Sequence, residues 1–403
     1  MNADIYDTFK QQLEALGARG QLRQLGSIAR RDETHADFNG KRYLNLSSND
    51  YLGLGANQAL LEEFLRQEHS GDLIDQFGLA SSSSRLLTGN AEAYARLETY
   101  LAAQYQAEAA CVFNSGYHAN IGIISALANR HDLILSDKLN HASMMDGLLL
   151  AQAKYFRYRH CDYDHLEQLL EQHRAQFQRT FIITESVFSM DGDVADLQRL
   201  VELKNRYNAL LIVDEAHAVG VFGEHGLGVC EVQGVTQEID VLICPLGKAP
   251  ASLGAYAITN RILKEYLVNT MRPLIFTTAL PPMCVNWTLF VMQKIAGMQA
   301  ERRYLQALSQ RFRQALIAHG LNTDGDSQII PVMIGANDAA VRVSERLREQ
   351  GYLIFAIRPP TVPPNTARLR LSLNAAMRWE QLAPLPEAIA AALHEMALDS
   401  TAA

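Results

Sequence analysis

A single lysine, Lys248, stands in a stretch whose composition disfavours a charged side chain. It lies in PLGKAPASLGAYA (245–257), directly after the apolar run 240–244, and small residues follow it. An amine is a nucleophile only when it is unprotonated, and desolvation among small apolar residues disfavours the ammonium form. The pattern therefore admits two interpretations, a lysine that reaches solvent from a strand end or a nucleophile that is kept partly neutral.

Other polar residues also stand just after short apolar runs that indicate buried strands. Ser115, Gly116 and Tyr117 follow 110–113, His141 comes after 133–136, Ser189 after 181–184, and Asp214 and His217 after 209–213. In open parallel sheets, ligands bind outside the carboxyl ends of the strands, so we expect these side chains to line one crevice. The turn 114–117 also opens a predicted helix, whose free N–H groups and positive dipole end suit a phosphate.

Together these groups match the requirements of pyridoxal 5′-phosphate (PLP). Its aldehyde needs an amine such as that of Lys248 to form a Schiff base, and its pyridine nitrogen needs a carboxylate such as Asp214. His141 is a candidate for the ring face, and His217 and Ser189 are candidates for the phenolate oxygen. Each residue alone has an ordinary structural interpretation, as a surface lysine, a helix cap, a structural histidine or a turn serine. Their joint placement at successive strand ends favours the functional hypothesis.

The elements that must position these residues alternate between short apolar strands and longer helical patterns. Strands rich in Val, Ile and Leu, each followed by a helix, are typical of an α/β fold with a mostly parallel sheet flanked by helices. The strands are expected at 110–113, 133–136, 181–184, 209–213, 240–244 and 255–259, with helices near 118–128, 142–152 and 196–207. After Pro281 and Pro282 the pattern changes. We expect an N-terminal arm (1–45), a large PLP-binding domain (46–285) and a smaller α+β C-terminal domain (286–403).

Composition excludes several classes of function. The 403 residues are 48% hydrophobic and 20% charged, which is typical of a globular protein, and the net charge of −8 argues against a nucleic-acid partner. No apolar run is long enough for a membrane span, and the N-terminus lacks the pattern of a signal peptide. The five cysteines are scattered and show no CxxC spacing. We therefore expect a cytoplasmic protein with reduced cysteines, no membrane association and no metal site.

Three rival motifs fail on their context. DEAH (214–217) matches a helicase signature, but the nearest phosphate-loop candidate, 242–249, lacks both the first glycine and the terminal hydroxyl of GxxxxGK[ST]. The glycine-rich stretch 220–228 does not follow the GxGxxG pattern of a dinucleotide site. No GxSxG motif of a serine hydrolase is present.

With these residues in view, the chain resembles the α-oxoamine synthases, which are PLP-dependent enzymes of fold type I related to the class II aminotransferases. The matching blocks extend over most of the chain: SSNDYLGLG (47–55), FNSGYHAN (113–120), LSDKLNHAS (135–143), ESVFSMDGD (185–193), VDEAHAVGVFGEHGLG (213–228), LGKA (246–249), FTTALPP (276–282) and IRPPTVPPNTARLRLSL (357–373). The last block points to the branch that condenses L-alanine with a pimeloyl thioester, carried by acyl carrier protein or coenzyme A. That branch releases 8-amino-7-oxononanoate and CO₂ in biotin biosynthesis.

The resemblance implies a role for each matching position. Lys248, His141 and Asp214 would be catalytic, with Lys248 attached to PLP and moving protons at the substrate α-carbon. The cofactor would be held by Ser115, Gly116, Tyr117, Ser189, Asp214, His217, Lys248 and the strand end at Pro245, and by Thr277 or Thr278 of a second subunit. The substrate would be held by Arg23, Asn49, His141, Thr361 and Arg370, with Arg370 on the amino-acid carboxylate. A homodimer is implied, because members of the family build each site from two chains.

Two departures from the family pattern leave alternatives open. Pro245 stands where the family usually has a threonine whose hydroxyl contacts the phosphate, and proline offers neither a hydroxyl nor an N–H. The loop ASSSSR (80–85) replaces a glycine-rich one. One alternative is another α-oxoamine synthase, such as 2-amino-3-ketobutyrate ligase acting on glycine and acetyl-CoA. A second is a non-enzymatic relative that has lost tight PLP binding.

Overall fold

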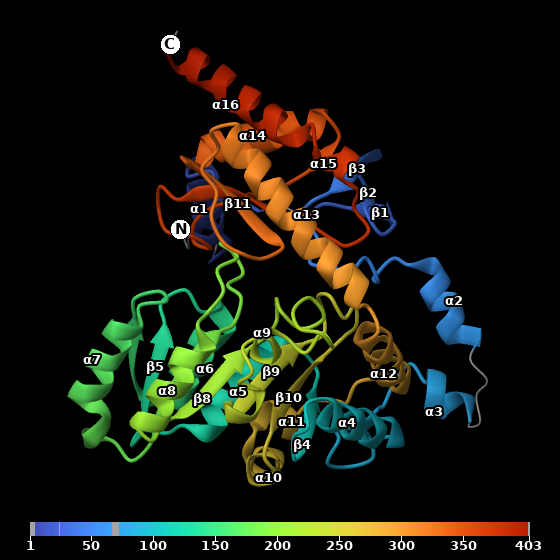
Figure 1. The fold of residues 1–403 in the computed structure, drawn as a ribbon, viewed down its shortest axis with the longest axis vertical. Helices are drawn as coiled ribbons and strands as arrows, with labels where there is room; N and C mark the ends of the chain where they lie inside the picture. The colour runs from blue at the N-terminus through green and yellow to red at the C-terminus, as the bar shows by residue number, and fades with distance from the viewer. Residues whose placement is uncertain (1–4, 24, 67–71, 402–403) are drawn as a thin grey trace. The chain divides into compact units, whose positions relative to one another are not determined.

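The computed structural model describes residues 5–23, 25–66 and 72–401, which form two compact units. The larger unit comprises residues 49–189 and 193–304. The smaller unit comprises residues 1–48, 190–192 and 305–403. Figure 1 labels their helices and strands, and each unit is described by itself.

A seven-stranded sheet forms the centre of the larger unit, in the order β4-β10-β9-β8-β7-β5-β6. Its strands are β4 (Ala109–Phe113), β5 (Leu133–Asp137), β6 (Lys154–Tyr158), β7 (Thr180–Glu185), β8 (Leu210–Asp214), β9 (Val241–Pro245) and β10 (Ala255–Thr259). Neighbouring strands from β9 to β6 pair in parallel, whereas β10 runs antiparallel to both β9 and β4. The expected α/β fold with a mostly parallel sheet is confirmed.

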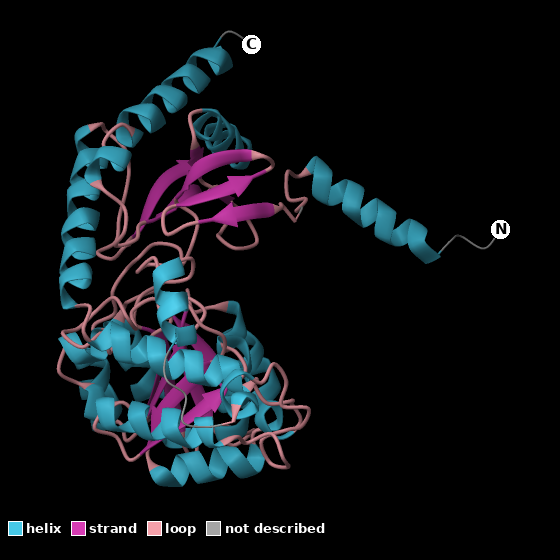
Figure 2. Ribbon diagram, turned by 90° about the vertical axis from the view of Figure 1, so that its right-hand side faces the viewer, coloured by secondary structure: helices cyan, strands magenta, loops and turns pink. Residues whose placement is uncertain are grey.

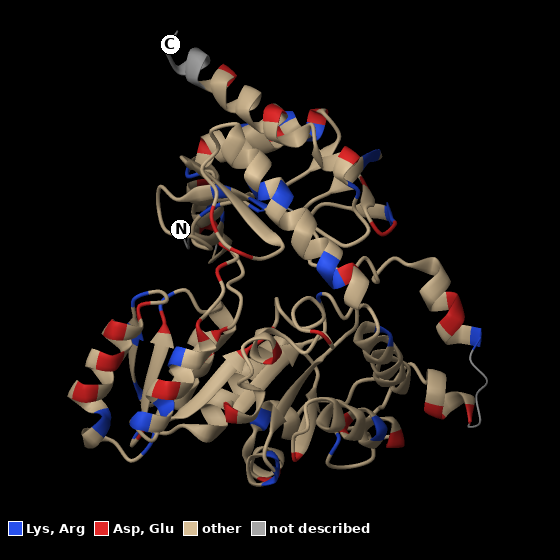
Figure 3. Ribbon diagram, in the orientation of Figure 1, with Lys and Arg blue, Asp and Glu red and all other residues tan. Residues whose placement is uncertain are grey.

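Helices flank this sheet because most of its strands are buried along their whole length. Every residue of β4, β5, β7, β9 and β10 is buried, as expected for strands covered on both faces. Figure 2 shows the strands surrounded by helices, and in Figure 3 the charged residues are concentrated on helices such as α7 while the central strands are almost free of them. The helices of eight or more residues are α2 (Gln58–Arg66), α4 (Glu92–Gln104), α5 (Gly116–Leu127), α6 (Ala142–Ala151), α7 (Tyr163–His173), α8 (Leu197–Arg206), α10 (Arg261–Thr270) and α12 (Pro282–Ala296). The shorter ones are α3 (Leu73–Phe77), α9 (Val229–Val232) and α11 (Arg272–Ile275).

The smaller unit contains two sheets and several helices. One sheet has the order β1-β2-β3-β12 and the other β11-β14-β13. The strands are β1 (Ile28–Arg31), β2 (His35–Phe38), β3 (Lys41–Asn45), β11 (Ile329–Gly335), β12 (Tyr352–Leu353), β13 (Ala356–Ile357) and β14 (Ala367–Ser372). The helices are α1 (Ile5–Ala18), the part of α13 (Gln299–Ala318) from Leu305 onward, α14 (Asn337–Glu349), α15 (Trp379–Leu382) and α16 (Leu385–Thr401). The first of these sheets contains strands from both ends of the chain, because β3 pairs in parallel with β12.

Within the part of the chain that the structure describes, no helix is both long and apolar enough to cross a membrane.

Candidate active site

A cavity of about 400 Å³ opens at the carboxyl ends of the parallel strands of the larger unit. Its volume lies in the range usual for small-molecule and cofactor sites. The predicted site residues that line it are Asn49, Ser115, Gly116, Tyr117, His141, Asp214, His217, Pro245 and Lys248. Most of the side chains that were expected to line one crevice therefore line this cavity, whereas Ser189 does not.

Asp214 is the last residue of β8 and is only 3% exposed. Its Oδ1 accepts a hydrogen bond from the N–H of Ala216 at 2.8 Å, and its Oδ2 accepts one from Asn120 Nδ2 at 2.7 Å. Both carboxylate oxygens are thus fixed by donors on different elements, the loop after β8 and helix α5. The group offers a buried, oriented negative charge at the cavity wall.

Lys248 lies in the tight loop that joins β9 to β10. The loop is closed by hydrogen bonds from the N–H groups of Leu246 to Gly254 O (3.0 Å) and of Ser252 to Leu246 O (2.9 Å). Within it, the N–H of Ala251 donates to the carbonyl of Lys248 at 2.8 Å. The lysine backbone is therefore held in place, and its half-buried side chain lines the same cavity as Asp214.

The N-terminus of α5 forms another part of the wall. Ser115 is its N-cap, and the Ser115 hydroxyl accepts a hydrogen bond from the N–H of His118 at 3.1 Å. The N–H groups of Gly116 and Tyr117 precede the first intrahelical bond, which runs from Ala119 N–H to Ser115 O at 3.0 Å. Unpaired N–H groups at a helix start are suited to an anion such as a phosphate.

Pro245 packs directly on this helix start. A Cβ added at Gly116 would lie 2.7 Å from Pro245 Cγ and 2.8 Å from Pro245 Cβ. A side chain at residue 116 would therefore collide with the proline ring, so glycine is required there. The proline occupies the space beside the expected phosphate position without supplying a hydrogen-bond donor.

His217 follows Asp214 in the loop after β8, and it is held by a contact with Tyr51. Its Nδ1 lies 2.6 Å from the Tyr51 hydroxyl, and that hydroxyl donates to Asn49 Oδ1 at 3.1 Å. The Tyr51 hydroxyl therefore links Asn49 to His217. The three residues form a connected polar group, of which Asn49 and His217 reach the cavity.

His141 is the N-cap of α6, and its partly buried imidazole lines the cavity. The backbone N–H of His141 donates to Glu185 Oε1 at 2.6 Å, and its ring Nδ1 lies 2.8 Å from the Ser143 hydroxyl. Desolvation by the surrounding protein lowers the pKa of His141, although Asp214 opposes the shift. At neutral pH the imidazole is therefore uncharged.

Glu185 ends β7, directly beside Asp214 on β8. Complete burial and the negative charge of Asp214 raise the pKa of Glu185 to about 8, although the N–H of His141 and the charge of Lys248 work in the opposite direction. Glu185 therefore keeps its proton at neutral pH.

The remaining predicted residues lie elsewhere. Ser189, Thr277 and Thr278 belong to the larger unit but do not line the cavity, and the Thr278 carbonyl instead accepts from Asn114 Nδ2 at 2.7 Å. In the smaller unit, Arg23 Nη2 donates to Thr361 Oγ1 at 3.2 Å, so the structure brings this predicted pair together. Arg370 lies in β14, is 8% exposed and donates to Ser372 Oγ at 2.8 Å.

Sequence reasoning missed Asn120, Ser143, Glu185 and Tyr51, which fix the side chains around the cavity. Glu185 carried a usable signal, because it ends a strand just as Asp214 does. Asn120 and Ser143 lie within helices, and their meeting depends on how α5 packs against α6. That packing leaves no local trace in the sequence.

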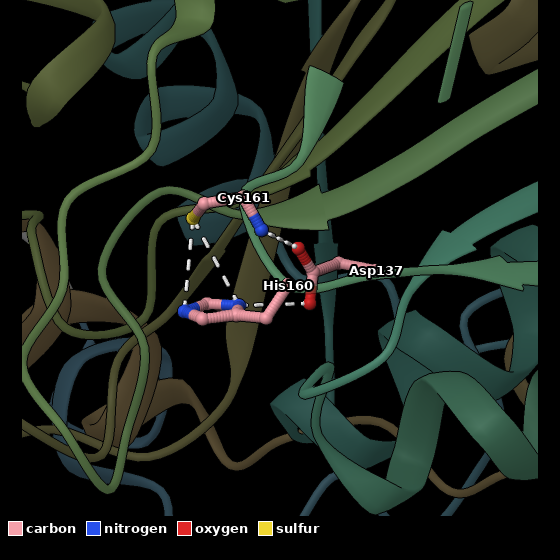
Figure 4. Close-up of side chains that lie close together, drawn as sticks. All are labelled: Asp137, His160 and Cys161. Atoms are coloured by element: carbon pink, nitrogen blue, oxygen red, sulfur yellow. Dashed lines mark hydrogen bonds and ion pairs between the residues drawn. The ribbon is translucent and has the colours of Figure 1, made fainter. Parts of the chain in front are cut away.

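A second group of titratable side chains, shown in Figure 4, ties together loops at the ends of β5 and β6. Asp137 Oδ1 lies 3.0 Å from His160 Nδ1, and Asp137 Oδ2 accepts from the N–H of Cys161 at 3.0 Å. His160 Nε2 lies 3.1 Å from Asp193 Oδ2. Although burial opposes the charge, the hydrogen bonds to Asp137 and Asp193 raise the pKa of His160 to about 12.

In this group His160 forms ion pairs with Asp137 and Asp193. Asp137, His160 and Cys161 lie close enough together to share a metal ion, but both ring nitrogens of His160 face carboxylates. A protonated imidazole has no lone pair for a metal. The expectation that the chain has no metal site stays a prediction.

The chain is similar in sequence and in structure to known proteins. The model of the aminotransferase class I and II family matches residues 41–389. The 8-amino-7-oxononanoate synthase of Chlorobaculum parvum is 53% identical over 94% of this chain and 96% of its own length. A serine palmitoyltransferase variant from S. paucimobilis, solved with a bound PLP–myriocin aldimine, has a TM-score of 0.89 and 27% identity over 98% of this chain and 100% of its own. The 8-amino-7-oxononanoate synthase of Francisella tularensis has a TM-score of 0.75 and 29% identity over 88% and 98% of the two chains.

Proposed function

Because the chain belongs to the class I and II aminotransferase family, we propose that its cavity binds PLP and that the protein is an acyltransferase. The reaction is the condensation of L-alanine with a pimeloyl thioester, with loss of CO₂ and release of 8-amino-7-oxononanoate. The observation that carries the proposal is that Lys248, Asp214 and the N-terminus of α5 line one cavity of about 400 Å³. These groups are a primary amine, a carboxylate and an anion seat.

The residues present fit the cofactor. Lys248 would hold it covalently through Nζ, and Asp214 would pair with its ring nitrogen. The N–H groups of Gly116 and Tyr117 would bind the phosphate, whose negative charge suits a helix N-terminus. The imidazole of His141 offers a flat surface for the ring. His217, whose Nδ1 lies 2.6 Å from the Tyr51 hydroxyl, would lie on its phenolate side together with Ser189.

When bound, PLP supplies an electron sink for negative charge at the α-carbon of the amino acid. The chain's own residues do the remaining work. The Lys248 amine takes the α-proton and later returns one, which requires its unprotonated form. Asp214 would pair with the ring nitrogen, and Asn120 and Ala216 hold both of its oxygens in place. His141 donates a hydrogen bond to the thioester carbonyl as negative charge develops there.

Substrate contacts from the smaller unit remain part of the proposal. Arg370 would bind the carboxylate of alanine, since a guanidinium matches a carboxylate in two-point geometry. Arg23 and Thr361 would contact the acyl chain or its carrier. In the larger unit, Asn49 would contact the amino acid. The acyl carrier is either acyl carrier protein or coenzyme A.

We propose that two copies of the chain form a homodimer. The larger unit exposes several large apolar side chains on α3 and on nearby loops: Leu73 (65%), Ile74 (68%), Leu79 (78%), Leu87 (78%) and Phe276 (69%). Large apolar surface of this kind is typical of an interface. Phe276 directly precedes Thr277 and Thr278, so the interface would bring these threonines towards the partner's cavity.

A cytoplasmic location is also part of the proposal. All five cysteines are free thiols, and Cys111, Cys230 and Cys244 are buried. Reduced cysteines are usual in the cytoplasm and unusual in secreted proteins.

Product formation from purified components tests the proposal. The protein is incubated with PLP, L-alanine and pimeloyl-CoA or pimeloyl acyl carrier protein, and the product is identified by mass spectrometry. We expect 8-amino-7-oxononanoate and CO₂, and both should disappear in Lys248→Ala together with the visible absorption band of lysine-bound PLP. Lys138→Ala, which removes an exposed lysine at another strand end, is the matched control. Turnover of glycine with acetyl-CoA in place of alanine would select the alternative activity.

A further inference from the structure

We propose that Ser143 and Asn120 are positioning residues that hold His141 as a neutral imidazole with its proton on Nε2. In this form Nε2 is the donor available to the acyl carbonyl oxygen. The inference rests on the proposed function for the identity of that acceptor. The tautomer of His141 itself follows from contacts around the cavity alone.

The partners of His141 Nδ1 determine the tautomer. Nδ1 accepts the backbone N–H of Ser143 at 3.2 Å, which is the N-cap interaction of α6. A backbone N–H can only donate, so Nδ1 must present a lone pair. The Ser143 hydroxyl lies 2.8 Å from the same nitrogen. A neutral imidazole with an unprotonated Nδ1 carries its hydrogen on Nε2.

Asn120 sets the direction of the Ser143 hydroxyl. Its Nδ2 donates to Asp214 Oδ2 at 2.7 Å and to Ser143 Oγ at 3.0 Å. A carboxylate only accepts, so the amide nitrogen, and not the amide oxygen, must face Asp214. Since the second Nδ2 hydrogen is directed at Ser143 Oγ, the hydroxyl hydrogen of Ser143 is left for His141.

The orientation of Asn120 leaves its own carbonyl unsatisfied. Asn120 Oδ1 is buried and has no hydrogen-bond partner among the described residues. Turning the amide over would place two acceptors, Oδ1 and Asp214 Oδ2, against each other. The unsatisfied oxygen is therefore the less unfavourable arrangement, and it shows that Asp214 dictates the direction of the hydrogen bonds.

Close packing of two helices makes these contacts possible. Asn120 lies on α5 and Ser143 on α6, and Gly147 of α6 faces α5. A Cβ added at Gly147 would lie 3.1 Å from Asn120 O and 3.1 Å from Ile124 Cβ. A side chain there would require α5 or α6 to shift by a few tenths of an ångström, so glycine at this position lets the two helices pack closely.

Charged groups on several elements face His141, and they do not act in one direction. Asp214 on β8 and Asp146 on α6 favour its protonation, whereas Lys248 in the β9–β10 loop opposes it. Glu185 on β7 accepts the backbone N–H of His141 and is itself protonated at neutral pH. The donors on Nδ1 add to the desolvation that favours the neutral ring.

The tautomer matters because Nδ1 is bonded to Ser143, so Nε2 is the ring nitrogen that can bond a substrate in the cavity. If Nδ1 carried the proton, Nε2 would present a lone pair to the acyl carbonyl oxygen and repel it. The Asn120–Ser143 pair excludes that state.

Nitrogen NMR of the protein with ¹⁵N-labelled histidine tests the inference without PLP or substrate. His141 is assigned through His141→Asn, and its ring shifts are followed with pH. We expect Nε2 to be protonated in the wild type. In Ser143→Ala the backbone N–H remains but the hydroxyl is lost, so the pKa of His141 should rise. Turnover should fall by about tenfold, the usual scale of one hydrogen bond.

Two further variants separate positioning from general damage. Ser143→Thr keeps the hydroxyl and should restore both the His141 titration and turnover. Ser125→Ala removes a hydroxyl on α5 that bonds only helix carbonyls, such as Ile121 O at 2.6 Å, and should leave both unchanged. A wild-type His141 with its proton on Nδ1, or a Ser143→Ala protein with an unshifted titration, would overturn the inference. Failure to bind PLP or form product would instead count against the proposed function.

Discussion

Two histidines near the same edge of the central sheet occupy opposite protonation states. His141 precedes α6 at the cavity, and its Nδ1 receives hydrogen bonds from Ser143. His160 follows β6, and each of its ring nitrogens faces a carboxylate, Asp137 or Asp193. The pKa is lowered at His141 by desolvation, whereas at His160 the hydrogen bonds to the two aspartates overcome desolvation and raise it to about 12.

The difference shows that direct partners, rather than burial alone, decide the charge of a histidine. Both rings lose water contacts, which lowers the pKa in each case. Only the ring with carboxylate partners stays charged. The charged His160 stabilises the loops that carry its two aspartate partners. The neutral His141 is suited to a place beside a cofactor whose ring nitrogen is protonated.

The largest effect is expected when His141 is given a carboxylate partner, as His160 has. Ser143→Asp places an acid in the first turn of α6, where it suits the helix dipole. We expect the pKa of His141 to rise by about two units. We also expect PLP affinity to fall by about 100-fold, because a charged imidazole repels the protonated pyridine ring. NMR titration and absorbance titration with PLP measure the two effects.

Ala142→Asp is the matched control for this substitution. Ala142 is exposed in the same turn, so the added charge would not touch Nδ1 of His141. Equal losses of PLP affinity in both variants would mean that charge in this turn, and not the state of His141, is responsible.

The next largest effect is expected when the cation of the second group is removed. His160→Gln leaves Asp137, which is 1% exposed, beside Asp193 without its positive partner. Breaking a buried ion pair from one side costs about 3 kcal/mol of unfolding free energy. Urea unfolding should show this loss near pH 6.5.

The pH dependence of this loss has a defined sign. His160 is protonated in the folded state up to a pKa of about 12, whereas its ordinary value is 6.5. Its contribution is fully present below about pH 6.5 and declines as the pH rises towards 12, because the unfolded chain then holds fewer protons. The penalty of His160→Gln should therefore shrink from pH 6.5 to pH 9. A penalty that is constant with pH would contradict the charged state of His160.

A smaller effect is expected at Glu185, which ends β7 and accepts the backbone N–H of His141. Its pKa is raised from 4.5 to about 8 by burial and by Asp214, so ionisation is disfavoured in the folded state. Wild-type stability should therefore decline by a few kcal/mol as the pH rises from about 4.5 to about 8, and Glu185→Gln should remove this slope. Thermal unfolding of the PLP-free protein across this range measures it.

The same variant should keep its turnover at pH 7 within about threefold, because glutamine resembles a neutral carboxyl group and still accepts the N–H of His141. Glu185→Ala loses that acceptor and should be less active. If Glu185→Gln were as inactive as Glu185→Ala, an ionised Glu185 would be required for the reaction.

Much of the fold followed from the sequence because apolar strands carry a local signal. The strand expected at 255–259 is β10, and the helix expected near 196–207 is α8 at Leu197–Arg206. Strand β6 was not predicted. Its sequence, KYFRY, mixes charged and aromatic residues because β6 is an edge strand, exposed at Lys154 and Arg157 and buried at Tyr158.

The site was predictable only where a strand end carries the residue. Asp214 and Lys248 follow buried strands, so position along the chain was enough to find them. Ser143 and Asn120 belong to the site because two helices meet at Gly147, and that contact depends on the tertiary structure. The Cys161 and His160 pair was not predicted for a similar reason, since Asp137 and Asp193 reach it from distant parts of the sequence.

The smallest effect is expected at Cys161, whose Sγ lies 3.8 Å and 3.7 Å from the two ring nitrogens of His160. Because both nitrogens carry protons that face Asp137 and Asp193, the thiol gains no metal ion as a shared ligand. Cys161→Ser should change the free energy of unfolding by less than about 1 kcal/mol. Zinc should leave the unfolding temperature of the wild type unchanged. If zinc stabilised the wild type and Cys161→Ser abolished this stabilisation, His160 would lose a proton and bind the metal together with Cys161. The difference between His160 and His141 would then be due to a bound metal ion and not to Asp137 and Asp193.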